Sequence, residues 1–209
     1  MKVVDISVPI HDAMTVYRGN PAVRIRAAMT LARDDVNLSA ICLGSHTGTH
    51  VDAPRHFVRG GAGIDRVDLK RFVGPAWVAD LREVRGAIAS GDLERAGIPR
   101  RTSRVLLRTR NSRLWHPARA FTTDFVYLAP DGADWLLQRG VRLVGIDYLS
   151  IEGFHVTGAP THRRLLGAGV PIVEGLDLYR VEPGRWNLIA LPLRIENGDA
   201  GMTRAVLAK

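Results

Sequence analysis

Residues 46 to 57, HTGTHVDAPRHF, combine the side chains that bind metal ions most readily. Three of the chain's seven histidines, His46, His50 and His56, lie within eleven positions of one another, and Asp52 lies among them. An even scatter over 209 residues would place fewer than one histidine in such a window. Neutral imidazole and carboxylate are ligands of zinc and other first-row metals. The residue types therefore indicate a divalent-metal site, with a hydrogen-bonded histidine cluster as the metal-free alternative.

The composition of this stretch favours an extended chain over a helix. On a helix His46 and His50 would share a face, but Asp52 would point away, and the glycine, threonines, valine and proline of the stretch are poor helix formers. In an extended chain the side chains alternate, so that every second residue faces the same way. The sequence therefore predicts that His46, His50 and Asp52 converge, with Gly48 leaving room between the rings. The proline that follows turns the chain and can bring His56 back.

This stretch resembles the signature of the cyclase-like metal hydrolases, a family that includes the bacterial kynurenine formamidases. Further segments with this resemblance cover nearly the whole chain: DISVPI at 5–10, VYRGNP at 16–21, GAGID at 61–65, VGPA at 73–76, GIDYLSIE at 145–152, PTHRRLLGAGVPIVEGL at 160–176 and LIALPLRI at 188–195. The resemblance implies a swivelling β/α fold with a mixed sheet, usually assembled as a homo-oligomer, a dimer or a tetramer. One departure is Arg18-Gly19-Asn20, which stands where the family often has a PGD-like string. That segment borders the substrate pocket in relatives.

The resemblance also implies a set of metal ligands. His46, His50 and Asp52 would hold a divalent ion, zinc or manganese, and Asp52 would bridge to a second ion held by His162 and Glu174, giving one or two ions per chain. The residues themselves partly support the distant pair. His162 falls at the start of a predicted helix and Glu174 at the carboxyl end of a predicted strand, where the sites of open α/β sheets gather.

The activity that the resemblance implies is metal-dependent hydrolysis of a small amide or ester. A metal-activated water would attack the carbonyl while His56 shuttles the proton. Hydrolysis of an arylformamide of the N-formylkynurenine type is the leading expectation. The alternatives are cyclase or dehydratase chemistry, or hydrolysis of a lactam or lactone, on the same metal core. No GxSxG motif occurs in the sequence, so a serine nucleophile of that type is not expected.

The elements that must position these residues alternate between strand and helix in the second half of the chain. Strands are predicted at 3–10, 23–29, 38–45, 76–81, 104–109, 125–128, 141–147, 170–174 and 186–195, and helices at 91–96, 130–139 and 161–166. Loops are predicted at 11–21 and 111–121, and a turn at the glycines of 60–63. The pattern predicts a single α/β domain over residues 1–209, with a parallel layer and an antiparallel part.

The net charge of +8 and the pI near 10.5 raise the possibility of a non-catalytic protein that binds nucleic acid or another polyanion. Only three of the 29 basic residues are lysines, and the arginines are spread along the chain without a basic tail. We therefore expect a small-molecule substrate and no nucleic acid. One or two arginines could hold a substrate carboxylate.

The remaining features predict a cytoplasmic protein without a membrane segment. The start, MKVVDISVPI, lacks the long apolar region of a secretory signal, and no uncharged apolar run approaches the ~18 residues of a membrane helix. The single cysteine, Cys42, is expected to be a buried strand residue rather than a nucleophile, because Ile41 and Leu43 flank it.

Overall fold

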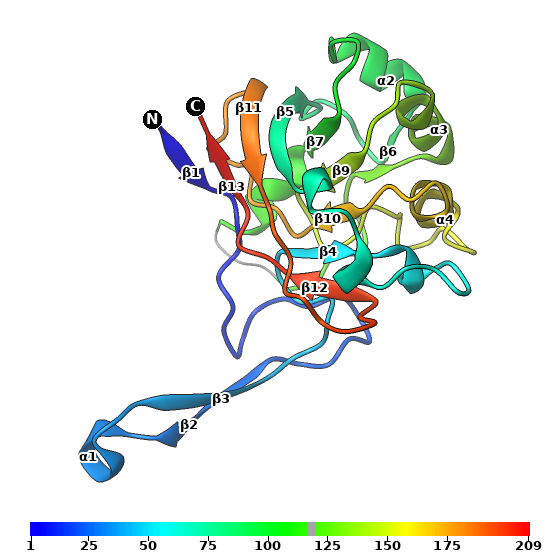
Figure 1. Cartoon of the computed structure of the whole chain (residues 1–209). Coiled ribbons are helices and arrows are strands. Elements are labelled where there is room, and N and C mark those ends of the chain that lie inside the picture. Colours follow the sequence, from blue (N-terminus) through cyan, green and yellow to red (C-terminus); the bar gives the residue numbers. More distant parts are fainter. Residues whose placement is uncertain (117–119) are drawn as a thin grey trace.

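The computed structural model describes residues 1–116 and 120–209 and is built around one large mixed β-sheet (Figure 1). In spatial order its strands are β1 (Val3–Asp5), β13 (Val206–Ala208), β11 (Gly184–Ile189), β5 (Val73–Asp80), β7 (Arg104–Arg108), β9 (Leu143–Ile146), β10 (Ile172–Glu174), β4 (His50–Asp52) and β12 (Ala200–Met202). The four central strands β5, β7, β9 and β10 are parallel to one another. All other pairings in this sheet are antiparallel. The predicted α/β class with a mixed sheet is confirmed.

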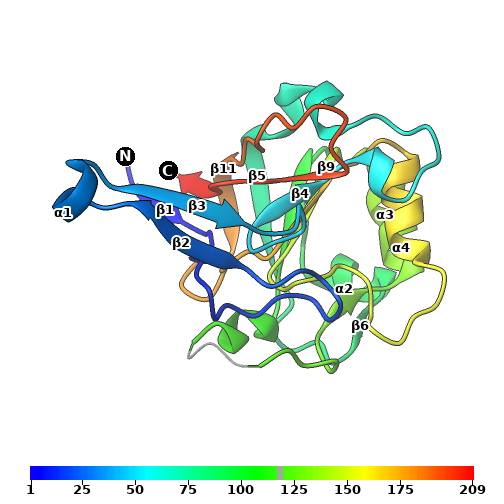
Figure 2. The same ribbon diagram turned by 90° about the horizontal axis from the view of Figure 1, so that it is seen from below.

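Helices cover one face of the sheet, and the curl of the sheet encloses the other (Figures 1 and 2). The covering helices are α2 (Ser90–Arg95), α3 (Pro130–Gln138) and α4 (Pro160–Gly167). On β7, Val105 and Leu107 belong to the core beneath these helices, whereas Leu106 belongs to the core on the opposite face. This two-sided burial explains why β7 reads as a nearly unbroken apolar run rather than as an alternating one.

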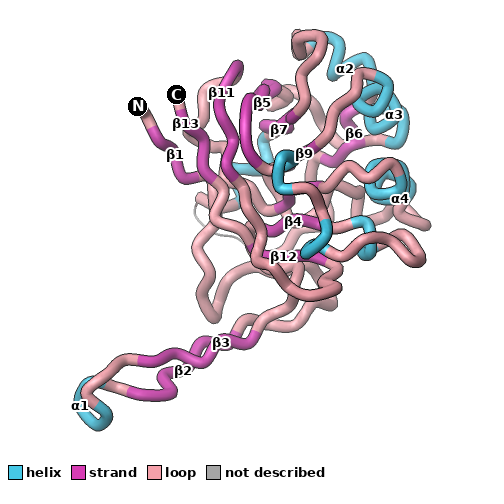
Figure 3. The backbone as a smooth tube through the Cα atoms, viewed as in Figure 1, coloured by secondary structure: helices cyan, strands magenta, loops and turns pink. Residues whose placement is uncertain are grey.

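Two smaller strand pairs and several short helical turns complete the described chain. Strand β2 (Arg24–Met29) pairs with β3 (Leu38–Cys42), and β6 (Ala87–Ile88) pairs with β8 (Tyr127–Leu128). The short helix α1 (Leu31–Asp34) joins β2 to β3, and this hairpin projects from the body (Figures 1, 2 and 3). The 3-10 turns are η1 (Pro54–His56), η2 (Ile64–Arg66), η3 (Leu69–Arg71) and η4 (Arg110–Leu114).

The helix predictions are confirmed to within two residues, and each predicted strand overlaps an observed one. The predicted strand at 3–10 ends at Asp5, and the one at 186–195 ends at Ile189. Strands β12 and β13 and helix α1 were not predicted, because each spans only three or four residues and shows no clear period. In the predicted loop at 111–121, residues 110–114 form η4, and residues 117–119 lie outside the described part of the chain.

Two further predictions concern the burial of Cys42 and the presence of a membrane segment. The prediction that Cys42 is buried is wrong: it lies exposed on the projecting hairpin, and Ile41 beside it is 61% exposed. Within residues 1–116 and 120–209, no helix combines the length and the apolar character needed to cross a bilayer.

Candidate metal centre

The candidate metal centre is built on β4, between β10 and β12. His50 and Asp52 are two residues apart on this strand, so their side chains share one face, as predicted. The antiparallel register of β4 with β10 places Glu174 directly opposite His50. Strand pairing thus brings together two side chains that are 124 positions apart in the sequence.

A turn, rather than an extended chain, brings His46 to the same point. Residues 45–49 form turns and bends, and Gly48 has a φ of +61°. The extended conformation predicted for 46–52 is therefore wrong before His50 and right from there on. Gly175, which follows Glu174, also has positive φ, and a Cβ atom there would collide with the carbonyl oxygen of Gly48. The two glycines allow the close backbone approach that seats the turn against β10.

Asp52 lies at the middle of the cluster, with one carboxylate oxygen toward each side. Its Oδ1 is 2.9 Å from His46 Nδ1 and 3.4 Å from His50 Nε2. Its Oδ2 is 3.6 Å from His162 Nε2. Glu174 closes the ring, with Oε1 3.2 Å from His162 Nε2 and Oε2 3.6 Å from His50 Nε2. The five residues expected to bind metal therefore lie together in one cluster.

Among the described residues, several buried atoms of this cluster find no hydrogen-bond partner. They are His50 Nε2 and both carboxylate oxygens of Asp52, whose residues are at most 1% exposed. A buried polar atom without a partner costs about 1–3 kcal/mol, and more if it is charged. Lone pairs that converge on a shared point are the arrangement that a cation satisfies. The unpartnered atoms and the nitrogen–oxygen donor set therefore fit a divalent metal ion.

The outward-facing nitrogens of two histidines have fixed acceptors. His50 Nδ1 donates to the carbonyl oxygen of Gly48 at 3.0 Å, and His46 Nε2 donates to Asp199 Oδ2 at 3.0 Å. Such a bond holds the tautomer and directs the other nitrogen inward, as is typical of metal-binding histidines. Sequence reasoning missed Asp199, because nothing in the NGDAG segment links it to a motif 150 residues away.

Glu152 likewise orients the His162 ring, and the sequence analysis did not predict this residue. Its Oε2 accepts from the backbone N–H groups of Thr161 at 2.9 Å and His162 at 3.2 Å, and lies 3.4 Å from His162 Nδ1. This carboxylate therefore satisfies the start of α4 and orients the ring. Its second oxygen, Oε1, is buried and has no partner. The family resemblance of the segment GIDYLSIE is the one sequence signal that points to this residue.

We expect Glu152→Gln to weaken metal binding about 10–100-fold, the usual effect of losing an outer-shell partner. The amide keeps the size of the side chain but removes the negative charge that faces His162. Competition with a fluorescent chelator measures the affinity. Glu94→Gln provides the control, since Glu94 bonds only to Trp135 away from the centre and should leave the affinity unchanged. Equal affinities in wild type and Glu152→Gln would contradict an orienting role.

The carboxylates of the centre shift the pKa values of two histidines upward. Burial lowers the pKa of His46, but the close contact with the Asp52 carboxylate and other nearby negative charges outweigh it and raise the value to about 9. Burial also lowers the pKa of His162, but Glu152 and Glu174 outweigh it and raise the value to about 10. Asp52 has its pKa held well below the usual range: burial alone would raise it, but His46 and His50 prevail. The cluster thus attracts positive charge, which a divalent cation can supply in place of protons.

His56 lies beside the cluster on η1, which follows β4 directly. Its ring is 3.9 Å from the His46 ring and 5.9 Å from the His162 ring, centroid to centroid. The turn at Pro54 returns the chain to the centre, as predicted. Burial lowers the pKa of His56 to about 4; Asp52 opposes this shift, and the neighbouring histidines add to it. The imidazole is therefore neutral at neutral pH and can accept a proton. Ligand atoms of His56, Asp52 and His162 also lie within 4.8 Å of one another.

A cavity of about 260 Å³ opens onto the centre and has partly aromatic walls. Tyr17, Phe57 and Phe154 line it together with Asn20. The RGN segment was expected to border a pocket, and Asn20 does so. Of the described residues that line this cavity, none is an arginine. The walls therefore suit an aromatic group better than a substrate held by an arginine clamp.

Three further histidines of the chain are loop residues. His11, His116 and His155 are exposed and lie outside helices and strands. His116 pairs with Asp177 at 2.6 Å. His155 packs against Phe154, which lines the cavity, but is not itself a lining residue.

Comparison with known proteins agrees with this geometry. Residues 4–153 match the model of the Cyclase family, described as "Putative cyclase". A kynurenine formamidase from Salinibacter ruber is 38% identical over 212 residues, and one from Sphingopyxis alaskensis is 35% identical over 207 residues. In both comparisons 99% of this chain and 97% of the relative are covered.

Solved structures show the same fold. A predicted metal-dependent hydrolase from Bacillus stearothermophilus superposes with a TM-score of 0.85 at 38% identity, covering 99% of this chain and 97% of the other. An isatin hydrolase bound to the product analogue thioisatinate superposes with a TM-score of 0.86, covering 99% and 91%. At 21% identity, this second likeness concerns the fold alone.

Proposed function

Because this chain belongs to the cyclase family and is a metal-dependent hydrolase, we propose that it hydrolyses the amide bond of an N-formylated aromatic amine, with N-formylkynurenine as the leading candidate. The observation that carries the proposal is the cavity in which aromatic side chains face a centre of imidazoles and carboxylates. The relatives that cover nearly the whole chain are kynurenine formamidases, which supports the same bond type.

We assign the metal ligands as the sequence predicted them. His46, His50 and Asp52 would hold one divalent ion, zinc or manganese, and His162 and Glu174, together with Asp52, would hold a second. When bound, a divalent ion supplies Lewis acidity, which polarises a carbonyl group and lowers the pKa of water. The orphaned atoms of His50 and Asp52 are the structural support for this assignment.

His56 is the proposed proton carrier. As a neutral imidazole it accepts a proton from the attacking water and delivers a proton to the departing nitrogen. The carbon–nitrogen bond breaks, and the products are formate and the free aromatic amine. The rings of Tyr17, Phe57 and Phe154 place the aryl group by apolar contact and hold water away from it.

The experiment is a substrate panel with enzyme that has been stripped of metal and reloaded with zinc or manganese. The panel contains N-formylkynurenine, an isatin-like lactam, a simple lactone and an aliphatic formamide without a ring. We expect the aryl formamide to give the highest kcat/KM and the aliphatic one a much higher KM. Faster turnover of the lactam or the lactone would instead identify the enzyme as a lactam or lactone hydrolase. Turnover by the stripped enzyme would overturn the metal assignment.

We further propose that residues 1–209 act as one catalytic domain in the cytoplasm, on a small-molecule substrate and without a nucleic-acid partner. The identification as a hydrolase speaks against the non-catalytic polyanion-binding alternative.

A further inference from the structure

A pocket of about 490 Å³ lies at the amino end of β7, where β11, β5 and β7 run side by side (Figure 1). Its lining includes four arginines and one tryptophan, and we call it the basic pocket: Arg100, Arg101, Arg104, Arg185 and Trp77. The metal centre lies at the other end of the parallel strands, because Arg104 begins β7 whereas Glu174 ends β10. None of the residues that line the basic pocket also lines the cavity at the metal centre, so the two sites are separate.

The arginines of the basic pocket lack acidic partners within the described chain. Of the described residues that line the pocket, none is an aspartate or a glutamate. Among residues 1–116 and 120–209, the arginines that form ion pairs all lie elsewhere. Four positive charges therefore face one pocket without a counter-charge, and an anionic ligand would supply it.

Arg104 is the buried member of this set. It is 8% exposed, and its guanidinium group donates to three backbone carbonyl oxygens of residues 70–75. Burial lowers the pKa of Arg104, and the like charge of Arg142 adds to this shift. At Arg108, the other buried arginine of the described ranges, two nearby aspartates oppose the same shift. Arg104 is therefore a buried charge that carbonyl groups hold in place but no carboxylate neutralises.

A closed turn carries two of the exposed arginines, Arg100 and Arg101. Thr102 Oγ1 donates to the carbonyl oxygen of Pro99 at 2.7 Å and so ties the two ends of this turn together. Arg101 has a φ of +66°, in the left-handed region that favours glycine. Backbone strain of this kind is found most often at functional sites, and here it belongs to a residue that lines the basic pocket.

Trp77 gives the basic pocket a flat apolar wall. The side chain is half-buried, because it packs against the core beneath the helices and also lines the pocket. The register of β11 with β5 places Arg185 directly opposite Trp77, so that the guanidinium group and the ring lie on the same face of the sheet. A ring beside several guanidinium groups suits a ligand that has both an aromatic ring and negative charge.

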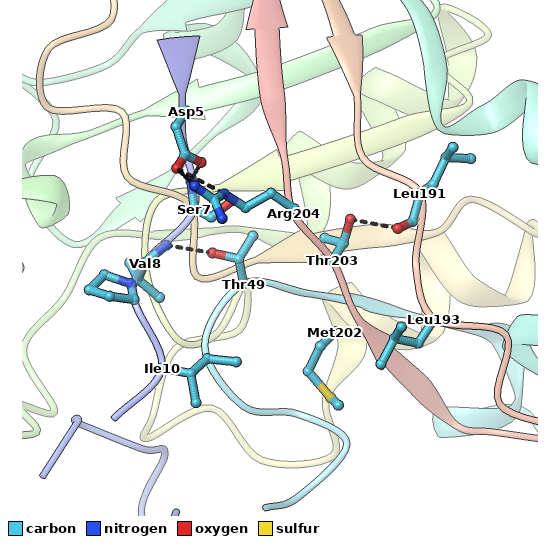
Figure 4. A pocket seen from close by; sticks show the side chains of 11 residues that line it. Asp5, Ser7, Val8, Ile10, Thr49, Leu191, Leu193, Met202, Thr203 and Arg204 are labelled. Atoms are coloured by element: carbon cyan, nitrogen blue, oxygen red, sulfur yellow. Dashed lines mark hydrogen bonds and ion pairs between the residues drawn. The ribbon is translucent and has the colours of Figure 1, made fainter. Parts of the chain in front are cut away.

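The larger groove on the body, of about 670 Å³, is different in kind (Figure 4). Of the described residues that line it, Arg204 is the one arginine, and it pairs with Asp5 at 2.9 Å between Nε and Oδ2. The rest of its lining includes Ile10, Leu193 and Met202. Because its arginine already has a carboxylate partner, this groove does not favour an anion as the basic pocket does.

We propose that the basic pocket binds a nucleoside diphosphate, with the base against Trp77 and the diphosphate between the arginines. Arg100, Arg101 and Arg185 are exposed and can turn toward a ligand. Their three charges match the about three negative charges of a diphosphate group at neutral pH. The volume of about 490 Å³ lies within the roughly 300–1,000 Å³ of small-molecule sites. The proposal is independent of the hydrolysis proposed above, since the two sites share no lining residue.

The test is isothermal titration calorimetry of the metal-loaded protein with ADP, adenosine and pyrophosphate. We expect ADP to bind and adenosine to bind at least about tenfold more weakly, because it lacks the phosphates that the arginines hold. Pyrophosphate should bind about tenfold more weakly than ADP, because it lacks the base that stacks on Trp77. The metal content is measured after each titration, so that removal of metal by phosphates is not mistaken for binding. Absence of ADP binding at millimolar concentration would overturn the proposal, and so would pyrophosphate that binds as tightly as ADP.

Variants locate the binding in the basic pocket. Arg101→Gln should weaken ADP and pyrophosphate alike, each by about tenfold or more, because it removes charge-assisted hydrogen bonds to phosphate. Trp77→Leu should weaken ADP to the level of pyrophosphate and leave pyrophosphate unchanged. Circular dichroism confirms that each variant is folded. If Trp77→Leu is not, the comparison of ADP with pyrophosphate on the wild type tests the same stacking.

Arg113→Gln is the matched control. Arg113 lines another pocket with several arginines, in which Glu83 and Asp124 supply negative charge, so this variant should bind ADP as the wild type does. An equal loss in Arg113→Gln and Arg101→Gln would reduce the binding to general attraction by the net charge of +8 and overturn the proposal. A single-stranded oligonucleotide that binds more tightly than ADP would also overturn it, since the pocket would then belong to a nucleic-acid surface.

Discussion

Asp52→Asn is expected to strip the protein of metal and to lower kcat/KM at least about 10³-fold. The substitution keeps the size of the side chain but removes its negative charge, and both Asp52 oxygens are buried without hydrogen bonds. They lie between His46 and His50 on one side and His162 on the other. Bound metal contributes several kcal/mol to such reactions, and each 1.36 kcal/mol is about tenfold in rate. Elemental analysis of the purified variant and steady-state kinetics measure the two effects.

Asp147→Asn is the matched control for this substitution. Asp147 is also fully buried, but it accepts hydrogen bonds from Thr109 and Ser112 rather than facing the centre. Burial, partly offset by these bonds, raises the pKa of Asp147 to about 6. This variant should lose stability yet keep its metal. If Asp52→Asn retained the wild-type metal content, the cluster around Asp52 would be a hydrogen-bonded one, and the metal would have to bind elsewhere.

His56→Ala is expected to keep the metal and lose about 10²–10⁴-fold in kcat/KM, the usual contribution of a general acid–base group. The pKa near 4 makes the imidazole neutral and able to accept protons above that pH. The His56-dependent part of the rate should therefore fall as the pH drops through this value, and the variant should lack that part. Added imidazole should restore some of the activity, because the vacated space borders the cavity.

The metal content of the His56 variant separates two roles for this residue. Its ligand atom lies within 4.8 Å of those of Asp52 and His162, close enough for a ligand. Loss of metal in parallel with activity would make His56 a ligand rather than a proton carrier. Full activity together with full metal content would remove it from the mechanism. Phe57→Ala controls for a change in packing, since Phe57 lines the same cavity next to His56 without a titratable group.

The sequence by itself determined which residue types gather at the centre and whether most elements are helices or strands. Two side chains spaced two apart on a strand share a face whatever surrounds them, so His50 and Asp52 could be paired from spacing alone. Proline starts and glycine ends located α3 and α4 within two residues. These features depend on neighbours in the chain, and local sequence encodes them.

Only the tertiary structure decided which distant residues meet and which strands are covered. Glu174 faces His50 because β10 pairs with β4 in one register, and Glu152 reaches His162 because its segment runs beside the start of α4. The residues of β3 read as an ordinary strand, yet they lie exposed on the projecting β2–β3 hairpin, and Cys42 with them. A strand pattern records how side chains alternate. What packs against them, and at what register, is set by contacts between segments far apart in the chain.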